Sequence, residues 1–174
     1  MAYGPQSIVD ALKNVILTTR AEASSKNYDG KSYVTGYYFS GVSNGTTVNI
    51  LLSNPLSSGR VLNTTQVNFS GTGVGTMQVK KNVTVSSTGT PLPILNRNTK
   101  YGDNTLTNSY YGATYSGGGA YPKEVLPAGI KETVAGSAPS TDFVIGPGDN
   151  LVLEITNGSG ASNQFSVRVT FDEE

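Results

Sequence analysis

Residues 151–171 have the sequence LVLEITNGSGASNQFSVRVTF, in which two alternating segments flank a turn. The apolar residues that share one parity are Leu151, Leu153 and Ile155, and then Phe165, Val167, Val169 and Phe171. The run of Asn, Gly and Ser at 157–160 is typical of a turn. Alternation with period two predicts strands that bury one face and leave the other in water. We therefore expect two antiparallel strands here.

The same pattern recurs along most of the chain. Alternating or β-rich segments occupy residues 31–40, 46–53, 61–69, 75–85, 129–134 and 142–145. About eight strands without intervening helices predict an all-β fold, an antiparallel jelly-roll sandwich with a short N-terminal helix or arm. An immunoglobulin-like sandwich is the alternative, but the Cys and Trp that usually mark its core are absent.

The N-terminal segment has a different period. Ile8, Leu12, Val15 and Ile16 fall on one face of a helix spanning residues 7–20, and Ser7 can cap its start. The alternative is a strand at residues 15–17. We divide the chain into an arm, residues 1–22, which acts as an anchor or an oligomer contact, and a β-sandwich domain, residues 23–174. That domain includes a long loop at about 86–124.

Composition excludes several functions. The chain has no Cys and no His, so disulfides, thiolate metal sites and histidine bases are impossible. Net charge is zero and only 14% of residues are charged, which argues against a nucleic-acid partner. No apolar run is long enough to span a membrane. The scattered carboxylates form no distinguished pair, so we expect no catalytic residues, no metal site and no cofactor.

The chain is rich in Asn, Ser, Thr and Gly where an ordinary domain would carry more charged residues. Its tyrosines concentrate in the long loop. Tyr110, Tyr111, Tyr115 and Tyr121 form a candidate surface-binding loop, because Tyr combines an apolar ring with a polar hydroxyl. Three interpretations remain open for them: contact between subunits, local packing on the domain's own sheet, and stacking on sugars.

Two further runs carry a resemblance to a known group. One spans residues 82–98, NVTVSSTGTPLPILNRN, and the other spans residues 143–157, FVIGPGDNLVLEITN. In their order they resemble segments of the jelly-roll head decoration and turret-type structural proteins of tailed viruses. The resemblance covers roughly residues 75–174, and the N-terminal third matches in order and spacing only.

The resemblance implies a virion structural protein without enzymatic activity or cofactor. It would be made in the host cytoplasm and would bind the capsid exterior as decoration, cement or turret, as a homo-oligomer with a trimer favoured. Its partners would be the major capsid protein or neighbouring virion proteins. The candidate contacts are Asn96, Arg97 and Asn98, together with the apolar face of the arm. The alternative function is a receptor- or glycan-binding module of a viral fibre or appendage.

Overall fold

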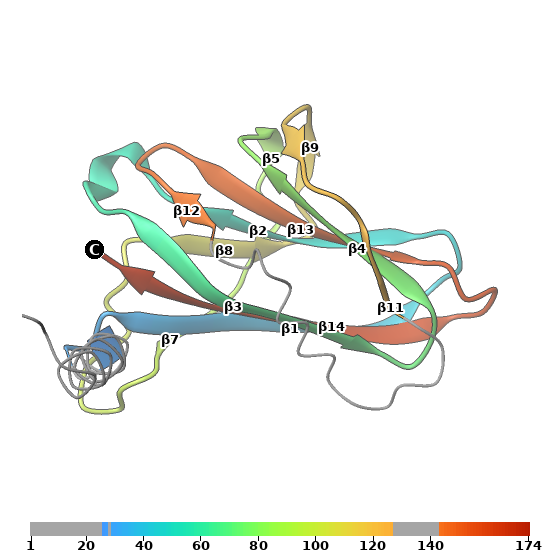
Figure 1. Cartoon of the computed structure of the whole chain (residues 1–174), viewed down its shortest axis with the longest axis horizontal. Coiled ribbons are helices and arrows are strands. Elements are labelled where there is room, and N and C mark those ends of the chain that lie inside the picture. Colours follow the sequence, from blue (N-terminus) through green and yellow to red (C-terminus); the bar gives the residue numbers. More distant parts are fainter. Residues whose placement is uncertain (1–25, 28, 127–142) are drawn as a thin grey trace, which may run out of the picture.

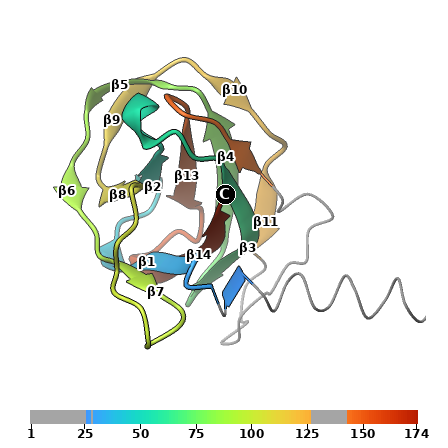
Figure 2. The ribbon, with the colours of Figure 1, turned by 90° about the vertical axis from the view of Figure 1, so that its left-hand side faces the viewer.

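The computed structural model describes residues 26–27, 29–126 and 143–174, and this part of the chain is all-β with antiparallel sheets. Two large sheets face each other across a common hydrophobic core, as the side view and the end view show (Figure 1, Figure 2). The expected helix at 7–20 and the expected strand at 129–134 lie outside the described residues.

The first sheet is centred on the last strand of the chain. Its order is β12 (Val144–Ile145), β3 (Leu62–Gly71), β14 (Asn163–Glu173), β1 (Ser32–Val42) and β7 (Ile94–Asn96). β14 pairs with β1 on one side and β3 on the other, which explains why the alternating residues 164–171 are buried on one face. The backbone of β14 is therefore hydrogen-bonded along both edges.

The second sheet is centred on β13. Its order is β10 (Gly119–Ala120), β4 (Gly75–Lys81), β13 (Asn150–Asn157), β2 (Thr47–Ser53), β8 (Asn108–Tyr111) and β6 (Thr90–Pro91), and β11 (Glu124–Leu126) also pairs with β4. The described part also contains the short 3-10 helix η1 (Leu56–Ser58). A separate pair, β5 (Thr84–Ser87) with β9 (Thr114–Ser116), lies outside the second sheet (Figure 1).

The main core lies between the inner faces of the two sheets. The first sheet contributes Phe165, Val167 and Val169, and the second contributes Ile50 and Leu153. Each of these side chains is almost fully buried, and burial of one such side chain contributes about 1.5–3 kcal/mol. The alternation seen in the sequence thus identifies the inward faces of β2, β13 and β14 correctly.

A second, smaller core lies on the outer face of the second sheet. Leu51 and Val152 point outward there, and Val83 and Ala113 cover them. We call the pair β5 and β9 with its flanking residues 83–87 and 113–116 the flap. Because the flap covers this face, β2 and β13 are apolar on both sides, which alternation alone does not reveal.

Two asparagine side chains hold the flap on the sheet. Asn49 of β2 donates from Nδ2 to the Ala113 carbonyl at 3.0 Å and accepts from the Ala113 N–H at 2.9 Å. Asn150 of β13 forms the same two bonds with Val83, at 3.0 and 2.9 Å. Each amide therefore substitutes for a strand neighbour and satisfies a backbone that would otherwise be buried without partners.

The prediction of one long loop at 86–124 is wrong. The segment contains five short strands, β6 to β10, which extend both sheets and form half of the flap. They are two to four residues long, too short for a period to show in the sequence. The expected strand 75–85 is likewise interrupted at Asn82, whose φ of 52° turns the chain from β4 into the flap.

We predict that Asn49→Ala and Asn150→Ala each lower the free energy of unfolding by about 1–2 kcal/mol, because each leaves a buried backbone pair unsatisfied. Amide hydrogen exchange in β5 and β9 should accelerate more than in β14. The control is Asn108→Ala, an exposed position of β8, with an effect below about 0.5 kcal/mol. Unchanged exchange at Ala113 in Asn49→Ala would show that the amide does not hold the flap.

Candidate functional site

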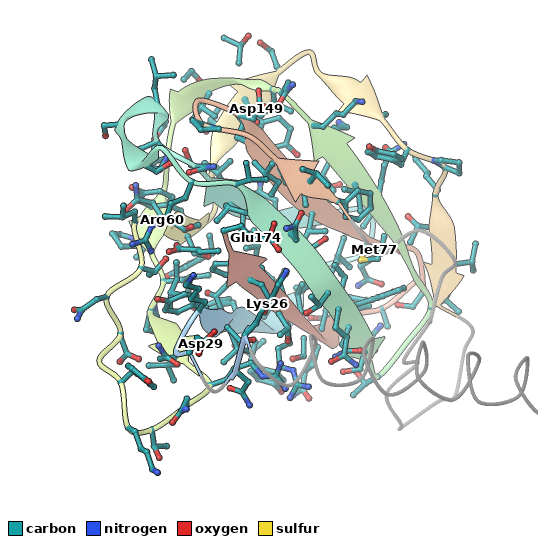
Figure 3. The ribbon with its side chains drawn as sticks, turned by 60° about the vertical axis from the view of Figure 1, so that its left-hand side comes forward. Lys26, Asp29, Arg60, Met77, Asp149 and Glu174 are labelled. Carbon is teal, nitrogen blue, oxygen red and sulfur yellow. The ribbon has the colours of Figure 1, made fainter. Side chains whose placement is uncertain are left out.

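Several loops that are far apart in the sequence converge at the end of the domain where the chain terminates. This end, which we call the C-terminal end, is formed by residues 26–27, 29–31, 54–61, 96–107, 146–149 and Glu174 (Figure 3). Lys26 and Glu174 form an ion pair across it. Lys26 is also the first residue that the structure describes, so the chain enters the described domain at this end.

A buried carboxylate ties these loops together. Glu173 is 1% exposed, and its Oε2 accepts a hydrogen bond from Arg60 Nη1 at 2.7 Å. Its Oε1 accepts from the Thr107 hydroxyl at 2.8 Å, from the Thr105 hydroxyl, and from the Leu106 N–H at 3.2 Å. One side chain at the end of β14 therefore fixes the loop 97–107 and the loop 54–61 in place.

These contacts also set the ionisation of Glu173. Burial is the largest influence and opposes the charged form, but the hydrogen bonds from Thr105, Thr107 and Arg60 together outweigh it. The pKa of Glu173 therefore lies below its ordinary value, and the carboxylate is charged at neutral pH.

The structure places Asn96, Arg97 and Asn98 at the C-terminal end, where they organise the loop. Asn96 donates from Nδ2 to the Gly30 carbonyl at 2.8 Å and accepts from the Asn98 N–H at 2.9 Å. The Arg97 N–H binds the Ser32 carbonyl at 2.9 Å, while the Arg97 side chain is exposed. A contact of these residues with another protein stays a prediction.

Exposed apolar side chains surround this organised loop. Leu56 is 79% exposed, and Tyr101 and Leu106 are about half exposed. The Tyr101 ring lies directly against Gly30, which has a φ of 68° and leaves no room there for a Cβ. We did not predict Leu56 or Leu106 from the sequence, although an isolated Leu inside a polar Asn, Pro and Ser turn was a usable signal for Leu56.

The four loop tyrosines pack against the domain itself. Tyr111 stacks on Tyr37 with ring centroids 4.0 Å apart and planes at 11°, and Tyr121 meets Phe143 edge to face at 4.9 Å. Tyr110 and Tyr115 pack against the small core beneath the flap. Local packing, one of the three open interpretations, therefore describes how these side chains lie, and binding of a ligand by them stays a prediction.

Tyr115 also belongs to a charged network on the second sheet. Its hydroxyl donates to Glu154 Oε1, which also accepts from Lys80 Nζ at 2.8 Å, and Lys80 lies 5.5 Å from the Tyr115 ring centroid. Burial, and then the neighbouring carboxylate, raises the pKa of Tyr115 far above its ordinary value. The carboxylates of Glu154 and Glu173 thus each accept hydrogen bonds from more than one protein donor.

The structure does not test every expectation from the sequence. The apolar face of the arm, formed by Ile8, Leu12, Val15 and Ile16, lies outside the described residues. Within residues 26–27, 29–126 and 143–174, no three acidic side chains gather as they would around a metal ion. Among the helices of the described residues, none has the length and apolarity needed to cross a membrane.

Comparison with known proteins does not place the chain in a family. No protein-family model matches the chain, and no characterised protein is similar to it in sequence at a significant level.

We predict that Glu173→Gln lowers the free energy of unfolding at pH 7 by about 2–3 kcal/mol, because it removes a buried, hydrogen-bonded charge and leaves Arg60 without its partner. The folded-state pKa lies below the unfolded-state value of about 4.3. The stabilisation is therefore complete above about pH 5 and is lost as the pH falls through the folded-state pKa.

Urea unfolding between pH 3 and pH 7 measures this effect: the difference between wild type and Glu173→Gln should shrink on acidification. Glu174→Gln is the control, since its exposed ion pair with Lys26 contributes less than about 0.5 kcal/mol. A pH-independent difference would contradict the assignment of a depressed pKa.

Proposed function

We propose that this chain is a non-enzymatic virion structural protein that binds the capsid exterior as an oligomer through its C-terminal end. The observation that carries the proposal is the convergence, at one end of the domain, of exposed apolar side chains, a carboxylate-organised loop and Lys26, the first described residue. Exposed apolar groups on a rigid surface are typical of a docking site.

The strand order supports the jelly-roll part of this proposal. The main strands in chain order are β1, β2, β3, β4, β10 with β11, β12, β13 and β14. The first sheet joins the first strand to the last, then to the third and the sixth. The second sheet joins the second strand to the seventh, then to the fourth and the fifth. This nesting is the pattern of two Greek keys wrapped into a jelly roll.

The surface chemistry supports an assembly function. The C-terminal end presents Leu56, Tyr101 and Leu106 among exposed charged side chains of both signs, which include Arg97, Lys100, Asp103 and Glu174. Docking would therefore combine burial of apolar area with charge complementarity at the rim. A capsid has local rotation axes, and a symmetric oligomer placed on such an axis, with a trimer as the favoured form, would bind through repeated weak contacts.

Microscopy of purified native particles tests the proposal directly. We expect density for the domain on the outer surface, with the C-terminal end facing the capsid. Absence of the chain from purified particles would end the proposal, and a capsid-facing flap would overturn the assigned orientation.

We predict that Leu56→Asp and Leu106→Asp weaken co-sedimentation with native particles at least about tenfold, because each places a charge in an apolar contact. Both side chains are exposed, so the free energy of unfolding should change by less than about 0.5 kcal/mol. Val125→Asp is the matched control, an equally exposed apolar position on β11 outside the C-terminal end. Equal losses in all three variants would refute end-on docking.

The arm generates a separate prediction for the full-length chain. Leu12→Asp and Ile16→Asp should abolish trimerisation or particle binding while the β domain keeps its unfolding midpoint, because the arm's apolar face then contacts a partner. Analytical ultracentrifugation and denaturant unfolding measure the two effects. A drop in stability without loss of assembly would show that this face packs on the chain's own core.

A further inference from the structure

The outer face of the first sheet is hollowed in a line that crosses β7, β1, β14 and β3. Three adjoining hollows have volumes of about 350, 270 and 130 Å³, and neighbouring hollows share Tyr38, Ser166 and Arg168 in their walls. Neither the core nor the C-terminal end uses these outward side chains. The face is separate from the four tyrosines of the flap and the second sheet.

The strand register produces the groove. One cross-strand row consists of Tyr38, Ser166 and Ser70, and the next consists of Gly36, Arg168 and Asn68. Gly36 has no side chain, and a Cβ built there would lie 3.1 Å from the Arg168 Cα. The groove is therefore open beside Arg168, and a larger residue at position 36 would close it and disturb the pairing.

Two polar side chains in this row lack partners within the described residues. Arg168 is exposed and forms no ion pair in this part of the chain, and no acidic residue lines any of the three hollows. Asn68 is only 7% exposed, and its side chain makes no hydrogen bond to a described residue. The polar atoms of Asn68 face the hollow, so this amide and the Arg168 guanidinium beside it offer adjacent polar groups to a ligand there.

An aromatic and apolar wall stands beside these groups. Tyr38 is 54% exposed at the junction of two hollows, and Leu95 is 51% exposed at the rim with Pro93. An exposed aromatic ring next to short hydroxyl and amide side chains matches the two kinds of surface on a sugar ring. The guanidinium adds a planar, bidentate partner for a carboxylate.

We propose that this groove binds an acidic saccharide chain, with a uronate carboxylate on Arg168, a sugar face on Tyr38, and hydroxyl groups on Asn68, Ser166 and Ser70. Addition of a peptide strand to β14, the central strand of the groove, is excluded because β14 is paired along both edges. A nucleic acid is disfavoured because the groove has one cation and cannot neutralise a run of phosphates.

The site is independent of capsid docking, since the groove lies on a sheet face and the docking residues lie on the C-terminal end. Failure of one proposal therefore leaves the other standing. Leu56→Asp should lose particle binding and keep saccharide binding, and a groove variant should do the reverse.

Isothermal titration of the full chain with tetragalacturonate, a guluronate tetramer and a hyaluronan tetrasaccharide tests the proposal. We expect at least one of these probes to bind, and the methyl ester of tetragalacturonate to bind at least about tenfold more weakly than the free acid if that probe is the one bound. Arg168→Gln should weaken binding about 10- to 100-fold. Tyr38→Ala should weaken it severalfold, and Tyr38→Phe should keep most of it.

Lys123→Gln is the control, because it removes the same charge from an exposed position outside the groove. Absence of binding by all three acidic probes overturns the proposal, as does equal weakening in Arg168→Gln and Lys123→Gln. Sedimentation of the Arg168→Gln protein tests whether the groove is instead an oligomer interface. If this variant dissociates an oligomer, the groove is an interface between copies of the chain and the saccharide site is refuted.

Discussion

The register of β14 between β1 and β3 is the constraint on which the other features depend. It directs Phe165, Val167 and Val169 into the core and Ser166 and Arg168 into the outer groove. The same parity continues to the end of the strand and turns Glu173 inward. A slip by one residue would reverse all of these directions, because side chains alternate along a strand. The pairing of β14 with β3 is irregular between Thr170 and Phe171, where the register skips Thr65 of β3. The extra residue lies in β3, so the alternation of side chains along β14 is preserved.

Side-chain amides perform much of the work that ion pairs or disulfides perform elsewhere. Asn54 and Asn157 are almost fully buried, and each donates to two backbone carbonyls, as Asn157 does to Val42 and Ala161 at 2.7 Å. Asn49 and Asn150 hold the flap in the same manner. An amide both donates and accepts, so it satisfies a backbone without the desolvation cost of a charge. This explains how a chain with 15 Asn and 14% charged residues holds its loops in place.

The sequence predicted the long strands. β1, β2, β13 and β14 were recognisable because each is at least seven residues long and presents several apolar side chains to the main core. The flap was not recognisable, because β5 and β9 owe their place to single contacts from Asn49 and Asn150 rather than to a period of their own. The hydrogen bonds of Glu173 could not be predicted from the sequence either, because its partners Arg60 and Thr107 are 113 and 66 residues away from it in the chain. Asn96, Arg97 and Asn98 were found by resemblance, and their internal hydrogen bonds explain why such a run keeps its form.

The groove and the C-terminal end lie on different parts of the domain, so one molecule could use both as binding surfaces. The C-terminal end lies where the strands finish, while the groove lies across the strands on a sheet face. If the C-terminal end meets a capsid, the first sheet stands upright from that surface and its outer face stays open to solvent or to a neighbouring copy. The buried carboxylate of Glu173 and the guanidinium of Arg168 lie five residues apart on β14. Docking and saccharide binding would therefore use the end and the middle of one continuous, doubly paired strand, so that neither site requires a loop to rearrange.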